Sequence, residues 1–343
     1  MHTDVRRAER TADDVPELLL APDSFKGTFS AAAVAAALAA GVRDAGLRAR
    51  EMPIADGGEG TMDALSSALG ARRMTARVQD PLGRPVEAGF AVLPDGRTAL
   101  VEMAQASGLS LVAGDERDAY AASTWGTGEL IAAAVAAGAE HVVVSVGGSA
   151  TSDGGAGALG ALEAAGVAPR LTVLCDVQVP WESAPRVFGP QKGADPGTVR
   201  RLERRLDELA QDAPRDPRGV PMTGCAGGLS GGLWAFRGAE LLPGAAFVLD
   251  AVSFDAAAAS ASLVVTGEGS LDEQTFAGKA VGEVAARSRS LGVRCHAVVG
   301  RSELAPVRSL ELGLQGVTEA STAAEIRAAG AALARAVAAA MTD

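Results

Sequence analysis

The chain has 343 residues, of which 48% are hydrophobic but only 3% aromatic, and it carries a formal net charge of −11. This length predicts one large or two ordinary domains, with a core built from Ala, Val and Leu. The acidic balance argues against non-specific nucleic-acid binding, which needs basic side chains to displace counterions from the backbone.

Residues 1–16 are mixed in charge and contain no apolar stretch, so we expect a disordered extension and not a signal peptide. No apolar run is long enough to cross a membrane. Three scattered cysteines without a C-x-x-C pair are typical of a reducing compartment and disfavour a disulfide framework or a zinc site. We therefore expect a cytoplasmic protein without membrane or nucleic-acid partners, whose oligomeric state stays open.

The first strand is predicted at residues 17–22, and the loop DSFKGTFS leads from it into an alanine-rich helix that Ser30 can cap. A second strand near residues 48–54 runs through ADGGEGT into a helix at residues 62–70. Alternation of strand and helix is typical of a parallel sheet, which binds ligands beyond the carboxyl ends of its strands.

The pattern changes over residues 73–104, where three alternating runs are separated by the turn signals PLGR and PDGR. These signals predict an antiparallel meander. Helix and strand then alternate again, with a helix at 126–138, strands at 141–146 and 294–300, a strand followed by a loop within 262–269, and a helix at 278–292.

The interruption predicts an α/β protein of two domains. Both chain ends, residues 17–75 and 255–343, would form a Rossmann-like parallel-sheet domain, and residues 76–254 an inserted mixed α/β domain.

Six polar, glycine-rich loops follow predicted strands or open predicted helices. They are residues 23–27, 55–61, 147–155, 188–194, 224–232 and 266–279. Glycine allows a backbone to approach a ligand closely, although any single loop of this kind is equally well a plain connection. Lysine is rare in the chain, yet Lys26, Lys192 and Lys279 all lie in these loops, where a lysine can act as a point charge on phosphate.

Acidic side chains in the same loops have two interpretations. Asp and Glu near helix starts are commonly caps, which accounts for Glu59 and Asp153 when each is considered alone. Alternatively, some of them bind Mg²⁺, which usually takes one or two carboxylates plus waters and phosphates. Lysines, carboxylates and glycine-rich helix entries together are the parts that phosphoryl transfer requires.

Long motifs in a fixed order support the second interpretation. Between about Leu18 and about Gly300 the chain contains APDSFKGTFSA, ADGGEGT, DPLGRPV, VEMAQASGL, STWGTGELI, GGSATSDGGAG, FGPQKGA, AGGLSGG and TGEGSLDEQTFAGK. In these motifs it resembles the type 1 glycerate kinase family. The resemblance implies transfer of phosphate from ATP, with Mg²⁺, to D-glycerate, and a phosphoglycerate product that is mostly the 2-phospho isomer in bacterial members. It also implies a Rossmann-like domain with an inserted α/β domain.

The motifs suggest roles for individual residues, with Asp153 as the favoured base for the acceptor hydroxyl. The catalytic set is predicted to be Asp153, Lys192, Lys26 and Asp56. The predicted nucleotide contacts are Gly147, Gly148, Ser149, Thr151, Gly227, Gly228 and Lys279. The predicted substrate contacts are Asp23, Ser24, Arg84 and Gln191, and the predicted Mg²⁺ ligands are Asp176, Glu268 and Asp272. For Arg84 a purely structural role in the hairpin turn is the alternative.

The chain departs from the family pattern at residues 178–186, where Val179 stands in place of an Asn, and in a shortened connection before them. This departure leaves open a non-catalytic or altered-specificity relative that binds nucleotide and another small hydroxy acid. A nicotinamide-dependent dehydrogenase is disfavoured, because DSFKGTFSA lacks the G-x-G-x-x-G fingerprint.

Overall fold

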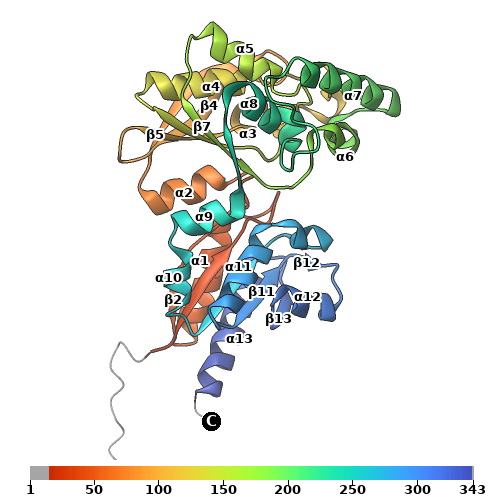
Figure 1. Ribbon diagram of the computed structural model, residues 1–343. Coiled ribbons are helices and arrows are strands. Elements are labelled where there is room, and N and C mark those ends of the chain that lie inside the picture. Colours follow the sequence, from red (N-terminus) through yellow and green to blue (C-terminus); the bar gives the residue numbers. More distant parts are fainter. Residues whose placement is uncertain (1–14, 342–343) are drawn as a thin grey trace, which may run out of the picture. The chain divides into compact units, whose positions relative to one another are not determined.

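The computed structural model describes residues 15–341, which divide into two compact units (Figure 1). The first unit comprises the described residues up to Pro53, Phe254–Asp272 and the described residues from Val284 onward. The second comprises Ile54–Ser253 and Glu273–Glu283. The extension expected over residues 1–16 lies, up to residue 14, outside the described residues.

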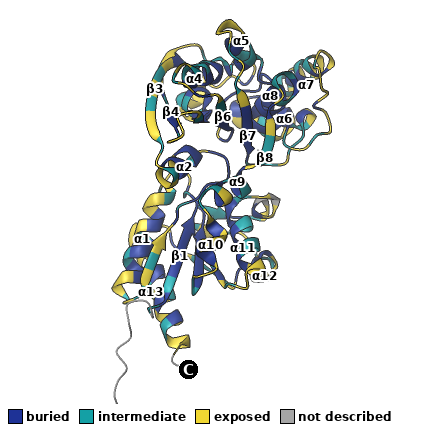
Figure 2. Cartoon of the chain, turned by 60° about the vertical axis from the view of Figure 1, so that its left-hand side comes forward, coloured by how far each residue is buried: buried dark blue, intermediate teal, exposed yellow. Residues whose placement is uncertain are grey.

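The first unit is built on a five-stranded sheet in the order β13-β11-β9-β1-β2, in which all neighbours are parallel. Its strands are β1 (Glu17–Pro22), β2 (Arg48–Glu51), β9 (Leu263–Gly267), β11 (Cys295–Val299) and β13 (Gly316–Glu319). β1 lies inside the sheet between β9 and β2, and its residues from Leu18 to Ala21 are fully buried (Figure 2), as expected of a strand covered on both faces. The prediction of a parallel sheet from both chain ends is thus confirmed.

Helices pack on this sheet, and two of them contact each other closely. The helices are α1 (Ala31–Asp44), α10 (Phe254–Ala258), α11 (Ala280–Ser290), α12 (Pro306–Leu312) and α13 (Ala323–Ala340), and α11 crosses from one unit to the other. A Cβ on Gly41 of α1 would overlap the α13 backbone, and one on Gly330 of α13 would overlap the α1 backbone. The Oγ of Ser30 accepts the N–H of Ala33 at 3.2 Å, which confirms the predicted cap.

The second unit is built on a six-stranded mixed sheet whose strands lie in chain order. They are β3 (Arg72–Gln79), β4 (Pro85–Val92), β5 (Thr98–Glu102), β6 (His141–Ser145), β7 (Arg170–Cys175) and β8 (Glu240–Pro243). β3 to β5 are antiparallel, which confirms the predicted meander, and β5 to β8 are parallel. The carboxyl ends of these four parallel strands therefore lie at one edge of the sheet.

Short helices surround this second sheet. They are α2 (Thr61–Leu69), α3 (Ala104–Ser107), α4 (Trp125–Ala136), α5 (Ala156–Ala164), α6 (Ala184–Phe188), α7 (Pro196–Gln211), α8 (Leu229–Arg237) and α9 (Gly244–Ala251). Three 3₁₀ turns matter for the site: η4 (Trp181–Ser183), η5 (Pro190–Lys192) and η6 (Cys225–Gly228). The core is mainly aliphatic, as the composition predicts, with Val142, Val144 and Val173 fully buried.

The second unit begins at Ile54, not near residue 76 as the pattern of strands suggested. Helix α2 packs against β4, β5 and α9 of the second sheet, and a carboxylate at the end of β5 accepts hydrogen bonds from its first turn. The segment Glu273–Glu283 also belongs to the second unit. Both differences arise because packing partners, which the local pattern does not reveal, decide the membership of a segment.

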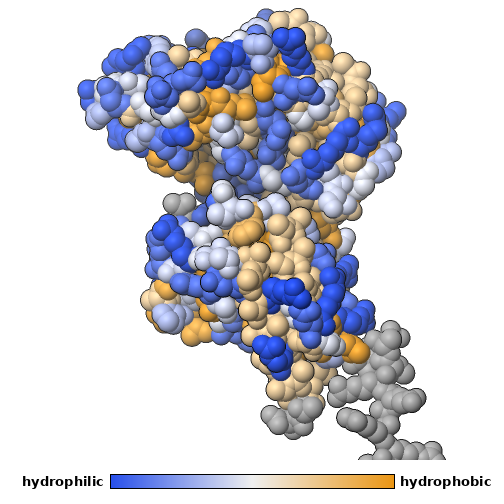
Figure 3. Space-filling view, turned by 180° about the vertical axis from the view of Figure 1, so that it is seen from behind, coloured by the Kyte–Doolittle hydropathy of each residue, from blue (hydrophilic) through white to orange (hydrophobic). Residues whose placement is uncertain are grey.

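None of the described helices is both long and apolar enough to cross a bilayer. In Figure 3, hydrophilic side chains are spread over the visible face of each part.

Candidate active site

The candidate site lies at the carboxyl edge of the second sheet, where three neighbouring strands end beside functional loops. β5 ends at Glu102, β6 leads into residues 146–153, and Asp176 directly follows β7. Since β5, β6 and β7 are parallel neighbours, their ends lie together, which is the usual ligand-binding edge of such a sheet.

Two predicted glycine-rich loops contact each other at this edge. A Cβ added to Gly147 would overlap the Cα of Gly58, and one added to Gly148 would overlap the carboxylate of Glu59. Gly148 also has φ +69°, a backbone conformation that L side chains rarely adopt. Glycine is therefore required here by close approach of two backbones, and the contact brings the loop of Asp56 against the predicted nucleotide loop.

Two carboxylates border one position beside Gly58. A Cβ built on Gly58 would lie 3.0 Å from Oδ1 of Asp56 and 3.7 Å from Oδ2 of Asp176. No group of three His, Cys, Asp or Glu side chains among the described residues forms a metal cage. Oδ1 of Asp56 also accepts the N–H of Gly58 at 3.0 Å. Two neighbouring carboxylates fit Mg²⁺, which is normally shared between protein carboxylates and substrate phosphates.

The loop after β6 offers donors that the protein itself leaves unused. The backbone N–H groups of Gly148, Ser149, Thr151 and Ser152 have no acceptor among residues 15–341. The side-chain hydroxyls of Thr151 and Ser152 are buried and likewise have no partner there. The N–H of Ala150, between them, donates to the carbonyl of Ser107 at 3.0 Å. Two pairs of neighbouring N–H groups thus lack an acceptor in the described part of the chain, and such groups can bind an anion; nucleotide contact at Gly148, Ser149 and Thr151 stays a prediction.

The start of helix α5, by contrast, is closed by the protein's own oxygens. Asp153 accepts the N–H of Gly155 through Oδ1 at 3.1 Å, and that of Gly157 through Oδ2 at 3.1 Å. Oδ2 also accepts the N–H and the hydroxyl of Thr124, at 2.9 and 2.8 Å. Asp153 is 1% exposed. These bonds describe a buried helix cap, and they give no support to the predicted role of Asp153 as proton acceptor.

Lys192 is a buried lysine at the centre of the site. It is 1% exposed, and its Nζ donates to Oγ of Ser149 at 2.7 Å and to the carbonyl oxygen of Thr151 at 2.6 Å. The Phe188 ring lies on another side, 5.9 Å from Nζ. Burial lowers the pKa of Lys192 to about 7, although the carboxylates of Asp153 and Asp176 act in the opposite direction.

Glu102 is a site residue that the sequence interpretation missed. It is 5% exposed, and its Oε2 accepts the N–H groups of Gly60 and Met62, at 3.0 and 3.2 Å, at the start of α2. Burial raises the pKa of Glu102 to about 7, with smaller increases from Asp63 and Glu59, while the two N–H groups lower it. The only sequence signal was an acid at the end of the apolar run TALVE.

The glycines of η6 pack against the same loop. Gly227 and Gly228 have φ angles of +64° and +92°. A Cβ on Gly227 would overlap the carbonyl of Thr151, and one on Gly228 would lie 2.9 Å from Cα of Gly154. These close contacts pack η6 against the loop after β6. Nucleotide contact by Gly227 and Gly228 stays a prediction.

A second cluster of predicted residues lies at the carboxyl edge of the first sheet. Asp23 follows β1, and Glu268 follows its neighbour β9. The N–H of Asp23 donates to the carbonyl of Gly267 at 2.8 Å, and its Oδ1 accepts the N–H of Ser24 at 2.6 Å. A Cβ on Gly269 would lie 3.3 Å from the backbone N of Lys26. The loops of Asp23, Ser24, Lys26 and Glu268 are therefore brought together within this unit.

The remaining predicted residues are placed less directly. Asp272 follows the short strand β10 (Ser270–Leu271), which pairs with β12 (Arg301–Ser302) in the first unit. Lys279 precedes α11, and its carbonyl accepts the N–H of Glu283 at 3.1 Å. Gln191 is exposed beside Lys192, and its backbone carbonyl accepts a bond from Arg117 at 3.3 Å.

Arg84 is held in the hairpin turn between β3 and β4. Its Nε donates to Asp80 at 2.6 Å, its Nη1 to Glu116 at 3.1 Å, and its Nη2 to the carbonyl of Leu111 at 3.2 Å. The hydrogen bonds that Arg84 donates to Asp80 and Glu116 raise the pKa of Arg84. These contacts favour the structural alternative for Arg84 over binding of a substrate carboxylate.

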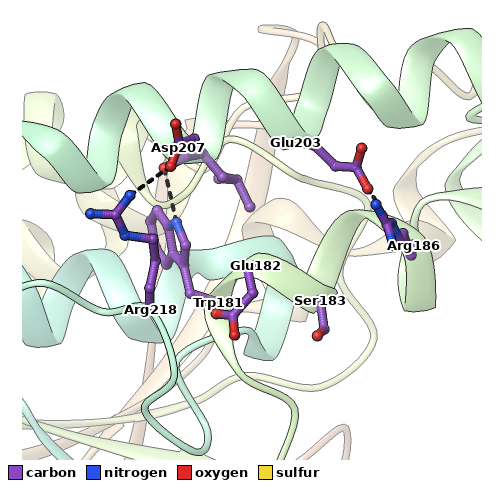
Figure 4. Close-up of a pocket in the computed structure, with 8 residues that line it drawn as sticks. Trp181, Glu182, Ser183, Arg186, Glu203, Asp207 and Arg218 are labelled. Atoms are coloured by element: carbon purple, nitrogen blue, oxygen red, sulfur yellow. Dashed lines mark hydrogen bonds and ion pairs between the residues drawn. The ribbon is translucent and has the colours of Figure 1, made fainter.

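The segment 178–186, where the sequence departs from the family pattern, contains Trp181 and borders a separate cavity of about 340 Å³ (Figure 4). The indole N–H of Trp181 donates to the carbonyl of Leu206 at 2.9 Å. Arg218 pairs with Asp207 at 2.6 Å, and Arg186 pairs with Glu203. Both arginines that line this cavity are thus paired with acids, and Glu182 accepts the N–H of Gly219 at 3.0 Å. The departure from the family pattern lies in packing around the indole.

Comparison with known proteins relates this arrangement to a described family. A family model described as "Glycerate kinase family" matches residues 18–169 and 166–342. A glycerate kinase from Halalkalibacterium halodurans is 38% identical over 82% of this chain and 85% of its own length. Glycerate 2-kinase from Escherichia coli K12 is 38% identical over 77% of this chain and 79% of its own.

A solved structure shares the architecture as well. The crystal structure of a protein assigned as glycerate kinase 2 from Salmonella typhimurium LT2 matches with a TM-score of 0.81 at 34% identity. The match covers 96% of this chain and 100% of that chain. The parallel sheet from both chain ends and the inserted mixed sheet are therefore common to both proteins.

Proposed function

The chain belongs to the glycerate kinase family, and we propose that it transfers the γ-phosphate of ATP to the 2-hydroxyl of D-glycerate. Membership makes it a phosphotransferase that uses ATP. The position of the phosphate on the product is the finer part of the proposal. It is supported by a relative named glycerate 2-kinase, which is 38% identical.

The single observation that carries the proposal is the pair of neighbouring carboxylates, Asp56 and Asp176, which lie 3.0 and 3.7 Å from the position that a Cβ on Gly58 would take. Next to it, the loop of Gly148 to Ser152 presents unused N–H groups. Mg²⁺ held by the two carboxylates would neutralise charge on the β- and γ-phosphate oxygens. The loop N–H groups would bind phosphate oxygens and hold the γ-phosphate in place for attack, since positioning and electrostatic stabilisation dominate phosphoryl transfer.

The cluster of the first unit is proposed to take part in substrate and metal binding, as the motif order predicts. Lys26 would neutralise an anionic group, Asp23 and Ser24 would contact substrate, and Glu268 and Asp272 would act as further metal ligands. Lys279 is proposed to neutralise phosphate charge. Arg84 and Gln191 are left out, because the contacts of Arg84 are structural and Gln191 shows none to the site. We place the reaction in the cytoplasm, in keeping with three free thiols.

The decisive experiment measures ADP release with Mg·ATP over D-glycerate, L-glycerate and related short hydroxy acids. We expect turnover to be fastest with D-glycerate, and ³¹P NMR of the product to show phosphate on C2. Asp176→Asn removes one of the two carboxylate charges beside Gly58 and should lower kcat at least 10²-fold. The matched control Asp115→Asn, an exposed acid of a separate 3₁₀ turn, should be active.

Two outcomes would contradict the proposal. If the protein binds Mg·ATP but no hydroxy acid raises ADP release above the rate without acceptor, the chain is a non-catalytic relative. If Asp176→Asn turns over like Asp115→Asn, the carboxylate pair does not serve the metal.

A further inference from the structure

We propose that Ser149 and Lys192 form the proton relay of the reaction, with Ser149 contacting the acceptor hydroxyl and Lys192 receiving the proton. This inference rests on the proposed kinase function and identifies its base. It replaces Asp153, which the motif pattern favoured, by a pair of residues from two separate loops.

The relay is built by the short contact between the two side chains. Nζ of Lys192 lies 2.7 Å from Oγ of Ser149, so a proton can pass between them without movement of either residue. A neutral amine would donate to the carbonyl of Thr151, 2.6 Å away, and would still present a lone pair to the Ser149 hydroxyl. Both contacts seen for Lys192 are thus compatible with its uncharged form.

Exposure sets the order of the relay. Lys192 is 1% exposed and Ser149 is 7% exposed, and we therefore assign the contact with the acceptor to Ser149, the less buried of the two residues. Ser149 also lies in the run of unused N–H groups that is proposed to hold phosphate oxygens. An acceptor hydroxyl beside Ser149 would therefore be adjacent to the γ-phosphate.

The charged surroundings of Lys192 allow a neutral amine near physiological pH. Burial lowers the pKa of Lys192 to about 7 and outweighs the charges of Asp153, in the loop after β6, and Asp176, after β7, which act in the opposite direction. Arg117 donates to the backbone carbonyl of Gln191, next to Lys192. Asp153 itself already accepts four hydrogen bonds as a cap.

The step balances as follows. The acceptor oxygen forms a bond to the γ-phosphorus, while the bond from that phosphorus to the β–γ bridging oxygen breaks and ADP leaves. The proton of the acceptor hydroxyl passes to Oγ of Ser149, and the Ser149 proton passes to Nζ of Lys192. Ser149 is regenerated unchanged, and the resulting ammonium of Lys192 returns its proton to solvent after product release.

The first test is the direction of the pH dependence in the unmodified protein. With Mg·ATP saturating, kcat/KM for D-glycerate reports the ionisation of the enzyme–Mg·ATP complex to which the acceptor binds. A relay requires neutral Lys192, so kcat/KM should rise with pH as Lys192 loses its proton and then level off. If Lys192 instead neutralises substrate charge as a cation, kcat/KM falls through the same range, and that result overturns the proposal.

The second test uses variants. Ser149→Ala should lower kcat about 10²-fold, at the lower end of the range for general acid–base catalysis. It should also abolish the rise of kcat/KM with pH, which is the ascending limb of the pH profile. Ser149→Thr, which keeps a hydroxyl, should restore part of the rate. The matched control is Ser107→Ala, which loses a buried hydroxyl contact of the same 2.7 Å length to Thr127 and should keep the limb.

Lys192→Arg tests the relay independently of Ser149, because a guanidinium keeps the positive charge but cannot release its proton. A fall in kcat of at least 10²-fold with Mg·ATP binding retained supports the relay, and activity within threefold of the unmodified protein refutes it. Should this variant fail to fold, the pH profile and Ser149→Ala still decide. Absence of any turnover in the unmodified protein would reject the kinase function itself, whereas turnover with a falling limb rejects only the relay.

Discussion

Glu102 gives the sharpest quantitative expectation, since its carboxyl is buried against the start of α2 and carries an elevated pKa. We choose Glu102→Gln, because the amide oxygen can still accept the N–H groups of Gly60 and Met62. Burial raises the pKa from 4.5 to about 7, so folding favours the protonated carboxyl. The stability that this shift contributes is fully present below pH 4.5 and is lost as pH rises through 7.

The magnitude follows from the size of the shift. At about 1.36 kcal/mol per pH unit, the difference between 4.5 and about 7 corresponds to about 3 kcal/mol of unfolding free energy. The hydrogen bonds of the amide do not change with pH, and the effect of the two N–H groups on the carboxylate is already included in the shift. We therefore expect Glu102→Gln to gain about 3 kcal/mol relative to the unmodified protein between pH 4.5 and pH 8.

Tryptophan fluorescence during urea unfolding is the suitable assay. All three tryptophans, Trp125, Trp181 and Trp234, lie in the second unit, so the signal reports the unit that contains Glu102. Other titrating groups cancel in the difference between the two proteins. Glu87→Gln, at an exposed position of β4, is the control and should show no trend. A difference for Glu102→Gln that stays constant from pH 4.5 to 8, or shrinks as pH rises, would refute the reasoning.

Three further substitutions test the site. Asp153→Asn should destabilise the second unit by about 2–3 kcal/mol, because its amide group meets N–H donors; unchanged urea stability with lost turnover would instead favour a base. Gly58→Ala, whose Cβ would lie between two carboxylates, should raise the Mg²⁺ concentration for half-maximal rate about tenfold, while Gly114→Ala, which meets open space, should not. Arg84→Ala should leave kcat and KM within threefold; a large rise in KM for glycerate would restore its predicted substrate contact.

Most of the architecture could be predicted from the sequence, because hydrophobic periodicity and turn signals are local properties. The strand at residues 17–22 was predicted with its observed bounds, and the turns PLGR and PDGR gave the meander. The order of the strands within each sheet was not part of the prediction. The assignment of α2 to the second unit could not be predicted, because the packing of α2 against β5 and α9 depends on residues far away in the chain.

The site was predictable as a set of loops but not as a set of roles. Asp153 illustrates why, because the same residue type at a helix start serves as a cap or as a base, and only its four bonds distinguish them. Glu102 was missed because its partners, the N–H groups of α2, become its neighbours only in the folded sheet. The contact of Ser149 with Lys192 likewise joins loops that are 43 residues apart.

The position of β1 between β9 and β2 also determines the order in which the protein can assemble on the ribosome. β1 pairs with β9, with Leu18 opposite Leu263, and the stretch from Ile54 to Ser253 is translated between them. Most of the second unit can therefore form during synthesis, while one edge of β1 waits without its neighbour. Closing so long a loop costs little extra free energy, about 0.6 kcal/mol for each doubling of length. The insertion thus delays completion of the first sheet far more than it weakens that sheet.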